Sequence, residues 1–334
     1  MSADGIVGAD DPAPQAVRDA TPRIAFATAP PEYLGSDDAD RPLHEEAAAA
    51  AGIELDHLVW SDPSAAWDRY DLVVVRSTWD YLDHLEAYGT WLAAMDELGT
   101  LHNPGRVIAW NLDKRYLLEL AAAGVPVIPT RVCADRDDVA DALAHASADA
   151  LAPSWTGRTG EVVVKPVVSA GSKLTGRFAS EDPAARALAT QILASGTAVL
   201  VQPAVPSVAT DGEVSTLVFG GAVSHTVRKG PLLALGGGLV GGTYTERITP
   251  EHLTPARRAL VESAVGAVGR LVGDRFGVTE SLLYARVDVV TLDDGTDVVL
   301  EVELAEPAFF LDTDPDAASR FAAEIARRVA AAPT

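Results

Sequence analysis

The chain has 334 residues, of which 48% are hydrophobic and 22% charged, a mixture typical of globular proteins and long enough for two or three domains. This composition excludes a disordered chain, a collagen and a coiled coil, and no apolar run reaches the roughly 18 residues that a membrane-spanning helix needs. Because 26 Lys and Arg face 48 Asp and Glu, the formal charge is −22, which argues against nucleic-acid and membrane partners.

Residues 1–21 are acidic, lack periodicity and predict a mobile tail. They do not have the basic and then apolar pattern of a signal peptide, so we expect a cytoplasmic protein. The single cysteine, Cys133, excludes a disulfide framework and is interpreted as a small buried hydrophobe. A lysine kept in an arginine-rich chain indicates where a compact ammonium is needed. The four lysines are Lys114, Lys165, Lys173 and Lys229.

Short apolar runs alternate with amphipathic segments between residues 22 and 104. Strands are predicted at Arg23–Thr28, Glu54–Trp60 and Leu72–Val75, and helices at Pro42–Ala51 and Leu82–Leu98. This alternation favours a parallel α/β domain over residues 22–104. Ligands of such sheets bind beyond the carboxyl ends of the strands.

A polar segment, RSTWDY, follows the third of these strands and runs from Arg76 to Tyr81. Its place at the strand end predicts that Arg76, Ser77, Thr78 and Asp80 bind the substrate, with the guanidinium gripping a carboxylate through two hydrogen bonds. The alternative is the start of a helix, with Thr78 or Asp80 as its N-cap. The sequence leaves both interpretations open.

The remainder of the chain predicts helices packed on antiparallel strands, an α+β pattern. Asn103-Pro104-Gly105 is typical of a turn and marks a boundary, after which we expect a central subdomain over 105–200 and a C-terminal subdomain over 201–334. Helices are predicted at Leu112–Ala123, Asp135–Ala146, Pro183–Ala194, Thr254–Val272 and Pro315–Val329. Strands are predicted at Glu161–Lys165, Ala198–Gln202, Val214–Phe219, Ala222–Arg228, Leu282–Val290 and Asp297–Val302, with loops at Pro153–Gly160 and, mobile and rich in glycine, at Leu235–Thr243.

A lysine and a loop of small residues stand together at the end of the strand Glu161–Lys165. Lys165 is followed by Pro166 and, a few residues later, by the small residues Ser169 to Ser172. An ammonium group beside unshielded loop amides is what a phosphate site requires. The Gly-x-x-x-x-Gly-Lys-Ser/Thr spacing of a P-loop is absent, which argues against that class of ATPase.

Acidic residues alternate with apolar ones near the C-terminus. Arg286 and Asp288 share one face of a predicted strand, and Glu301 and Glu303 share one face of the next. If the turn Asp293-Asp294-Gly295 joins the two strands, Asp288 meets both glutamates. Three carboxylates with no lysine beside them repel one another unless a cation lies among them, and oxygen ligands suit Mg²⁺ bound with phosphate. The alternative is two solvated strand faces.

In this order the motifs resemble the ATP-grasp superfamily, the fold of D-alanine–D-alanine ligase, glutathione synthetase and the ribosomal-protein glutamate ligase. Over roughly residues 22–330, the resemblance implies a Rossmann-like N-terminal domain followed by a two-part ATP-grasp fold that holds the nucleotide between antiparallel sheets. The fold class expected is therefore α/β plus α+β, with ATP and Mg²⁺ as cofactors.

The resemblance also implies a role for each matching residue. The nucleotide ligands are Lys114, Lys165, Ser169, Gly171, Ser172, Gln202, Ala204, Val205 and Glu213. The metal ligands are Asp288, Glu301 and Glu303, and the catalytic residues are Arg286, Lys165 and Arg228. Lys229 is expected to contact the substrate, and the alternative for it is a solvated charge at a strand end. Gln202 stands where Glu is frequent, and Glu303 replaces the Asn of the family pattern, which adds charge and implies tight dependence on Mg²⁺.

Two segments carry a narrower resemblance. Arg76–Tyr81 and Glu301–Leu311 (EVELAEPAFFL) are similar to a small ATP-grasp group that includes the O-ureidoserine cyclo-ligase of D-cycloserine biosynthesis. The implied reaction is carbon–nitrogen ligation: ATP activates the carboxylate of a small amino-acid-like substrate as an acyl phosphate, and an amine then displaces the phosphate. Ring closure within one molecule and joining of two amino acids both fit this scheme.

Three other functions compete with a ligase. A nicotinamide dehydrogenase lacks support, because no Gly-x-Gly-x-x-Gly follows the first strand, where the chain reads Ala27-Thr28-Ala29-Pro30-Pro31-Glu32. A non-catalytic nucleotide-binding module and an ATP-grasp kinase share the fold and differ from a ligase in their products. The sequence is compatible with a homo-oligomer and leaves open the acid, the amine and the pathway.

Overall fold

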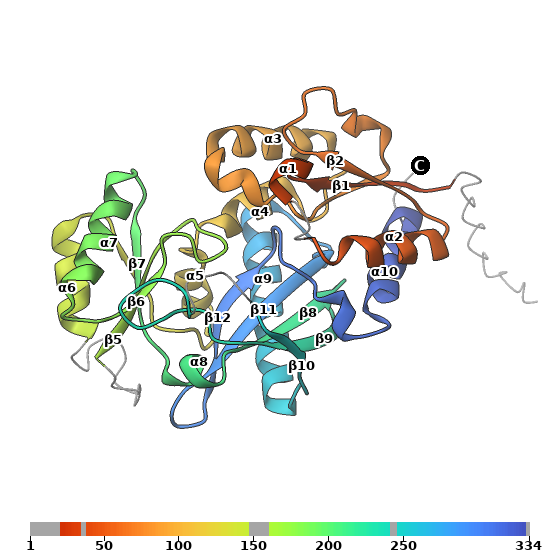
Figure 1. Ribbon diagram of the computed structural model, residues 1–334. Coiled ribbons are helices and arrows are strands. Elements are labelled where there is room, and N and C mark those ends of the chain that lie inside the picture. The colour runs from red at the N-terminus through yellow and green to blue at the C-terminus, as the bar shows by residue number, and fades with distance from the viewer. Residues whose placement is uncertain (1–20, 35–37, 147–159, 241–245, 332–334) are drawn as a thin grey trace, which may run out of the picture.

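The computed structural model describes residues 21–34, 38–146, 160–240 and 246–331 (Figure 1). The predicted tail, except Thr21, and the predicted loop Pro153–Gly160, except Gly160, lie outside the described residues, as does the end of the glycine-rich loop from residue 241. The described strands form three sheets. None of the described helices is both long enough and apolar enough to cross a membrane.

The N-terminal sheet is parallel, as predicted, and has the order β2-β1-β3. Its strands are β1 (Arg23–Thr28), β2 (Glu54–Val59) and β3 (Leu72–Val75). Its helices are α1 (Pro31–Leu34), α2 (Arg41–Ala50) and α3 (Leu85–Leu98), with the single turns η1 (Trp67–Arg69) and η2 (Trp79–Asp83) between strands and helices. All four residues of β3 are buried, because helices and loops cover both faces of the sheet.

The central sheet is antiparallel and has the order β4-β7-β5-β6. Its strands are β4 (Arg131–Cys133), β5 (Glu161–Pro166), β6 (Gly176–Ala179) and β7 (Val199–Pro203). The helices α6 (Arg136–Ala146) and α7 (Pro183–Ala194) cover its outer face and share one apolar core with it (Figure 1). Asp182 caps α7, because its carboxylate accepts a hydrogen bond from the Ala184 amide at 2.8 Å. The boundary predicted between residues 200 and 201 falls inside β7.

The C-terminal sheet is also antiparallel and has the order β10-β9-β8-β11-β12. Its strands are β8 (Glu213–Phe219), β9 (Ala222–Lys229), β10 (Ile248–Pro250), β11 (Tyr284–Thr291) and β12 (Asp297–Glu303). Helix α9 (Pro255–Phe276) packs on one face of this sheet. The short helix α8 (Pro206–Thr210) comes directly before β8 in the chain. After the turn η4 (Leu311–Thr313), α10 (Ala317–Ala331) returns to pack against α2 and the N-terminal sheet (Figure 1).

The turn predicted at Asn103-Pro104-Gly105 does not extend over Gly105, for a steric reason. The chain bends at Asn103, and Pro104 is the N-cap of helix α4 (Gly105–Leu112), which is followed by a separate helix α5 (Tyr116–Ala122). A Cβ atom at Gly105 would lie 2.3 Å from the carbonyl oxygen of Leu92. The glycine therefore allows α4 to approach α3 closely, a tertiary requirement that looks like a turn signal in the sequence. Elements of three to five residues carry no clear periodicity. The sequence therefore does not predict the short strands β4, β6 and β10 or the short helices α1 and α8.

Candidate active site

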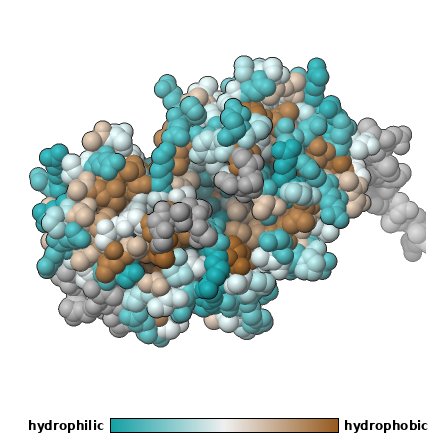
Figure 2. Space-filling view, viewed as in Figure 1, coloured by the Kyte–Doolittle hydropathy of each residue, from teal (hydrophilic) through white to brown (hydrophobic). Residues whose placement is uncertain are grey.

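A cavity of about 900 Å³ lies between the central sheet and the C-terminal sheet, and residues of the N-terminal domain also line it. In the space-filling view the surface is hollowed between the lobe that carries α6 and α7 and the rest of the molecule (Figure 2). Residues from both antiparallel sheets line the cavity, together with Trp79, Tyr81 and Leu82 of the N-terminal domain and the segment after β12. Its size and position suit a small-molecule site.

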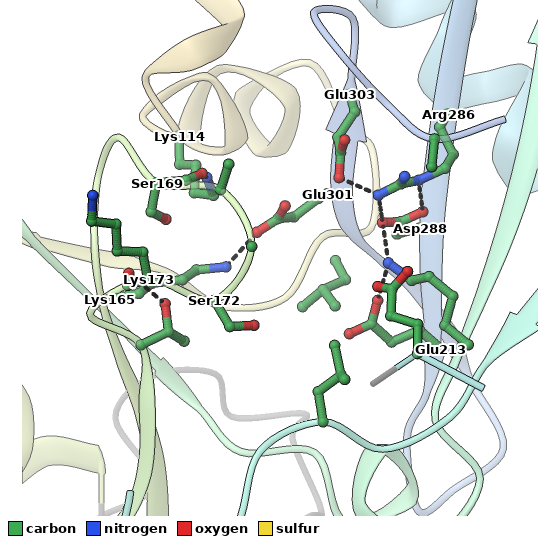
Figure 3. Close-up of a pocket in the computed structure, with 18 of the residues that line it drawn as sticks. Lys114, Lys165, Ser169, Ser172, Lys173, Glu213, Arg286, Asp288, Glu301 and Glu303 are labelled. Carbon is green, nitrogen blue, oxygen red and sulfur yellow. Dashed lines mark hydrogen bonds and ion pairs between the residues drawn. The ribbon is translucent and has the colours of Figure 1, made fainter. Parts of the chain in front are cut away.

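One wall of the cavity is cationic. Lys165 is the last residue but one of β5, and the Nζ of Lys114 donates a hydrogen bond to the Ser169 carbonyl at 2.6 Å. The loop after β5 is left-handed at Gly171 (φ +55°), where a Cβ would meet nothing within 4 Å. Lys114, Lys165, Ser169, Gly171 and Ser172, all predicted as nucleotide ligands, line the cavity together (Figure 3). Lys173 also lines it.

The end of β7 belongs to the same wall. Gln202, Ala204 and Val205 line the cavity at the end of β7, as the resemblance implied. The amide nitrogen of Gln202 donates a hydrogen bond to the Thr130 hydroxyl at 2.9 Å, which fixes its amide oxygen as the acceptor of that side chain. A neutral glutamine in this orientation keeps the acceptor function that a glutamate would have.

The opposite wall belongs to β11 and β12, which form the predicted hairpin. Asp288 lies opposite Glu301, and Arg286 opposite Glu303, with a bulge after Asp288. The guanidinium of Arg286 donates to both oxygens of Asp288 at 2.9 Å and also contacts Glu303 (Figure 3). The pairing thus brings Asp288 opposite Glu301, and Arg286 links Asp288 to Glu303.

Lys229 enters this wall from β9. Its Nζ lies 3.1 Å from Asp288 and 3.0 Å from Glu213, one of the predicted nucleotide ligands, and all three residues line the cavity. A Cβ at the preceding Gly212 (φ +76°) would lie 1.8 Å from the carbonyl oxygen of Lys229. The glycine before Glu213 therefore permits the close approach of the chain to β9.

Lys165 and Glu301 join the two walls. They point toward one another across the cavity, and Lys165 Nζ lies 2.5 Å from Glu301 Oε1 (Figure 3). The two residues are 136 positions apart and come from different sheets. Both side chains are more than four-fifths buried, so little water screens their attraction.

These ion pairs set the charge state of the carboxylates. Burial raises the pKa of Glu301, but the ammonium groups of Lys165 and Lys114 outweigh burial and lower that pKa to about 2. Burial also opposes ionisation of Asp288, yet Arg286 and Lys229 hold its pKa below the usual range. At Glu303 burial dominates over Arg286 and raises the pKa to about 7. The wall therefore contains two firmly ionised carboxylates and one that gains a proton readily.

The expectation that no lysine lies beside the three carboxylates is wrong, because β5 and β9 bring Lys165 and Lys229 to them from distant parts of the chain. Within the described residues, no group of three or more His, Cys, Asp or Glu side chains converges on a point suited to a metal ion. The donor chemistry nevertheless fits Mg²⁺, since three neighbouring carboxylates line one cavity and attract cations there.

Five predicted residues do not line the cavity, within the part of the chain that the structure describes. Arg228 lies on the opposite face of β9 from Lys229, where it pairs with Glu251 at 2.8 Å. The others are Arg76, Ser77, Thr78 and Asp80, which are buried at the end of β3.

Each of these four β3-end side chains has a partner inside the protein. Arg76 donates to the Pro307 carbonyl at 2.9 Å, Ser77 to Asp38 at 2.6 Å, and Thr78 shares a hydrogen bond with Tyr88 at 3.0 Å. Asp80 accepts from the indole of Trp60 at 2.7 Å, so neither Asp80 nor Thr78 caps a helix through its side chain.

Sequence reasoning missed several residues that line the cavity. Glu306 and Phe310 follow β12, and Trp79 and Tyr81 belong to η2. Burial raises the pKa of the Glu306 carboxyl, while Lys114 and a hydrogen bond with Tyr81 oppose that rise. A signal was present, because all four lie within the segments Arg76–Tyr81 and Glu301–Leu311 that resemble one ATP-grasp group. The resemblance indicated these two segments but did not indicate which of their side chains face the cavity.

Comparison with known proteins agrees with this geometry. The family model of the N-terminal domain of D-cycloserine synthetase DcsG matches residues 24–103. The cycloserine biosynthesis protein DcsG of Streptomyces lavendulae is 36% identical over 294 residues, which are 87% of this chain and 94% of that protein. The crystal structure of D-cycloserine synthetase DcsG has a TM-score of 0.80 and 32% identity over 92% of this chain and 99% of its own.

A more distant structure shares the fold alone. D-alanine–D-alanine ligase from Bacillus anthracis, solved in complex with ATP, has a TM-score of 0.58 and 13% identity, covering 92% of this chain and 97% of its own. The predicted fold class, a Rossmann-like domain followed by a two-part antiparallel fold, is confirmed by these likenesses.

Proposed function

The chain belongs to the D-cycloserine synthetase DcsG family of ATP-grasp ligases, and from this premise we propose that it activates the carboxylate of a small amino-acid-like substrate as an acyl phosphate and couples it to an amine. The enzyme class is that of ATP-dependent ligases that form carbon–nitrogen bonds. The observation that carries the proposal is the ion pair Lys165–Glu301, which joins a wall that bears lysines to a wall that bears carboxylates across one cavity.

The cationic wall is proposed to hold ATP. Gln202, Ala204 and Val205 offer amide groups to the base, Glu213 offers a carboxylate to the ribose, and Lys114 and Lys165 offer positive charge to the phosphates. The residues Ser169, Gly171 and Ser172 add a loop with little side-chain bulk. Mg²⁺ bound by Asp288, Glu301 and Glu303 would supply further neutralisation of phosphate charge.

In the proposed reaction, a carboxylate oxygen of the substrate attacks the γ-phosphorus, the bond to the ADP oxygen breaks, and ADP leaves. The amine then attacks the acyl carbon, phosphate leaves, and the amine gives up a proton. Arg286 and Lys229 lie on the cavity wall with fixed positive charge, which suits the oxyanions of both steps. Phe310 and the segment after β12 cover this wall, and exclusion of water protects an acyl phosphate from hydrolysis.

For the substrate we propose ring closure of an amino acid derivative whose amine lies on the same molecule. The family relatives are named for cycloserine synthesis, and tethering of the amine raises its effective concentration without a second amino-acid pocket. The same machinery also joins two separate amino acids in other ATP-grasp ligases, so the two outcomes need a direct test. The pathway proposed is that of a cycloserine-type antibiotic.

The test has a binding part and a product part. Calorimetry with Mg-ATP at millimolar concentration is expected to detect binding, and its absence contradicts the nucleotide site. Phosphate release is then followed with ATP, Mg²⁺ and one candidate acid at a time, from a panel of amino acids and their ureido and aminooxy derivatives.

Mass spectrometry of the products distinguishes the functions. A single-substrate product lighter than its substrate by at least one water, with ADP and phosphate, supports ring closure. Activity that requires two different amino acids together replaces ring closure by two-substrate ligation. A stable phosphoester without free phosphate indicates a kinase, and binding without turnover indicates a nucleotide-binding module.

A further inference from the structure

The two segments that resemble one ATP-grasp group lie against each other in the fold. The indole of Trp79 donates to the Glu306 carbonyl at 3.3 Å, and Arg76 donates to the Pro307 carbonyl at 2.9 Å. More than 220 residues separate the partners in each pair. The segment after β12 therefore crosses the end of β3, and it carries cavity-lining residues on its other side.

The side chain of Arg76 is held by contacts with protein groups where the two segments cross. Its side chain is 5% exposed, its guanidinium carbon lies 3.5 Å from the centre of the Phe309 ring, and its Nη2 lies 3.5 Å from a carboxylate oxygen of Asp40. A guanidinium stacked on an aromatic ring and hydrogen-bonded to a carbonyl has little freedom to bind a second carboxylate. Arg76 thus fixes the segment from Pro307 to Phe309.

Asp40 fixes the next residues. Its carboxylate accepts hydrogen bonds from the Phe309 amide at 2.6 Å and from the Leu311 amide at 2.8 Å. Between these two amides stands Phe310, whose φ is +54°, a left-handed conformation that a bulky residue rarely adopts. Such a conformation persists only where surrounding contacts hold it, and the two amide bonds to Asp40 are such contacts.

Phe310 links this turn to the carboxylate wall. Its ring lines the cavity, and the guanidinium carbon of Arg286 lies 5.7 Å from its centre, within the range of a cation–π contact. Arg286 is the residue that binds Asp288 and Glu303. The contacts therefore run from Arg76 and Asp40, through the turn at Phe310, to the proposed catalytic arginine.

We propose that Arg76 and Asp40 are positioning residues, which hold the turn Pro307–Leu311 so that Phe310 covers Arg286 and shields the reacting groups from water. This replaces the sequence-based hypothesis that Arg76 binds the substrate carboxylate. The proposal rests on the proposed function for the role of Arg286, whereas the hold on the turn is independent of it. Phe310 is the residue through which both act.

The kinetic test compares Arg76→Lys, Asp40→Asn and Phe310→Ala. Each is expected to lower kcat by roughly 10- to 100-fold, the scale of a small misplacement of reacting groups, while the KM values for ATP and for the acid change by less than about threefold. Because Arg76 acts through Phe310, adding Arg76→Lys to Phe310→Ala is expected to cost no further kcat. A raised KM for the acid with unchanged kcat overturns the proposal and restores substrate binding by Arg76.

A second measurement does not depend on activity. Hydrogen exchange of the Phe309 and Leu311 amides is expected to quicken at least about tenfold in Arg76→Lys and Asp40→Asn. The matched control is Arg328→Lys, which alters a similarly buried arginine that bonds Glu324 at 2.8 Å on α10 and does not line the cavity. It is expected to leave kcat and both amides unchanged.

The two measurements separate the possible failures. Unchanged exchange at Phe309 and Leu311 overturns the positioning role whatever the kinetics. Faster exchange with unchanged kcat shows that the turn does not serve the reaction and also overturns it. A wild-type protein that neither binds Mg-ATP nor releases phosphate defeats the proposed function instead, and the exchange data then still decide whether Arg76 and Asp40 hold the turn.

Discussion

The end of β3 and the hairpin β11–β12 carry similar side chains in opposite surroundings. Both offer an arginine and a carboxylate two to four residues apart, Arg76 with Asp80 and Arg286 with Asp288. At the hairpin these groups face a cavity of about 900 Å³, whereas at β3 their partners are protein groups such as the Pro307 carbonyl and the Trp60 indole. The difference lies in the segment after β12, which binds the end of β3 directly, whereas the hairpin side chains still line the cavity beside Phe310.

Polar residues at the end of a parallel strand do not by themselves form a ligand-binding site. Such ends lie where ligands bind, but a later segment of the chain fills that position here with its own carbonyl groups and aromatic rings. What separates the two arginines is whether another part of the chain occupies the space in front of them.

The strongest test of the comparison is Glu301→Gln. The substitution keeps the shape of the side chain but removes the charge that pairs with Lys165 at 2.5 Å and that is proposed to bind Mg²⁺. We expect turnover at saturating ATP to fall by roughly two to three orders of magnitude, the scale of losing one strong electrostatic partner of the transition state. Steady-state phosphate release measures it.

Lys165→Ala is expected to act similarly, because it removes the other half of the same pair. The matched control is Glu262→Gln, since Glu262 is an exposed residue of α9 whose pair with Arg258 is 3.8 Å long. Wild-type turnover of Glu301→Gln at limiting Mg²⁺ would show that the metal site is misplaced.

At the covered end of β3, Asp80→Ala is expected to lower the stability of the fold rather than the turnover. The change leaves the buried Trp60 indole without its acceptor at 2.7 Å, a loss of about 1–3 kcal/mol in the free energy of unfolding. Urea denaturation measures this loss, and Asp80→Asn should restore most of it, because an amide oxygen can accept the same hydrogen bond. A rise in substrate KM for Asp80→Asn with unchanged stability would place Asp80 in the substrate site after all.

A change of pH is expected to have a smaller effect on the free energy of unfolding. Burial first, and then Arg76, lower the pKa of His44 well below 6.5, so the folded protein resists protonation while the unfolded chain binds a proton below about pH 6.5. The stability contributed by neutral His44 is therefore present above that pH and is lost as the pH falls, by about 1 kcal/mol between pH 7 and 5.5. Glu301, with a pKa of about 2, stays ionised throughout this range.

His44→Gln tests this pH effect through urea midpoints at the two pH values. The difference between them should shrink in the variant but persist in part, because His57 and His102 also have lowered pKa values. An unchanged difference would mean that His44 titrates alike in both states.

The smallest effect is expected for Lys173→Ala. Lys173 lines the cavity but pairs with Asp83 at 2.5 Å, and both side chains are about half exposed. Exposed ion pairs contribute at most about 1 kcal/mol, so we expect the melting temperature and the KM for ATP to change little. A tenfold rise in that KM would instead assign Lys173 to the phosphates together with Lys114 and Lys165.

Much of the local structure follows from the sequence. The bounds of β1, β3 and α7 agree with the predicted ranges, because an apolar run, a capping residue and a terminating glycine act over a few neighbours. The alternation in β11 and β12 likewise predicts which residues share a face, and with the turn between them it predicts that Asp288 meets Glu301. The ATP-grasp resemblance assigned nucleotide-binding and metal-binding candidates that all line the cavity.

The tertiary structure alone decided which charges meet and which polar groups are covered. Lys165 lies 136 residues from Glu301, and Arg76 lies 231 residues from Pro307, so no local pattern specifies either contact. Gly105 shows the same limit, because its close approach to Leu92 depends on how two helices pack. Periodicity reports the direction of a side chain relative to its own strand or helix, whereas the groups it meets depend on the packing of segments that the sequence places far apart.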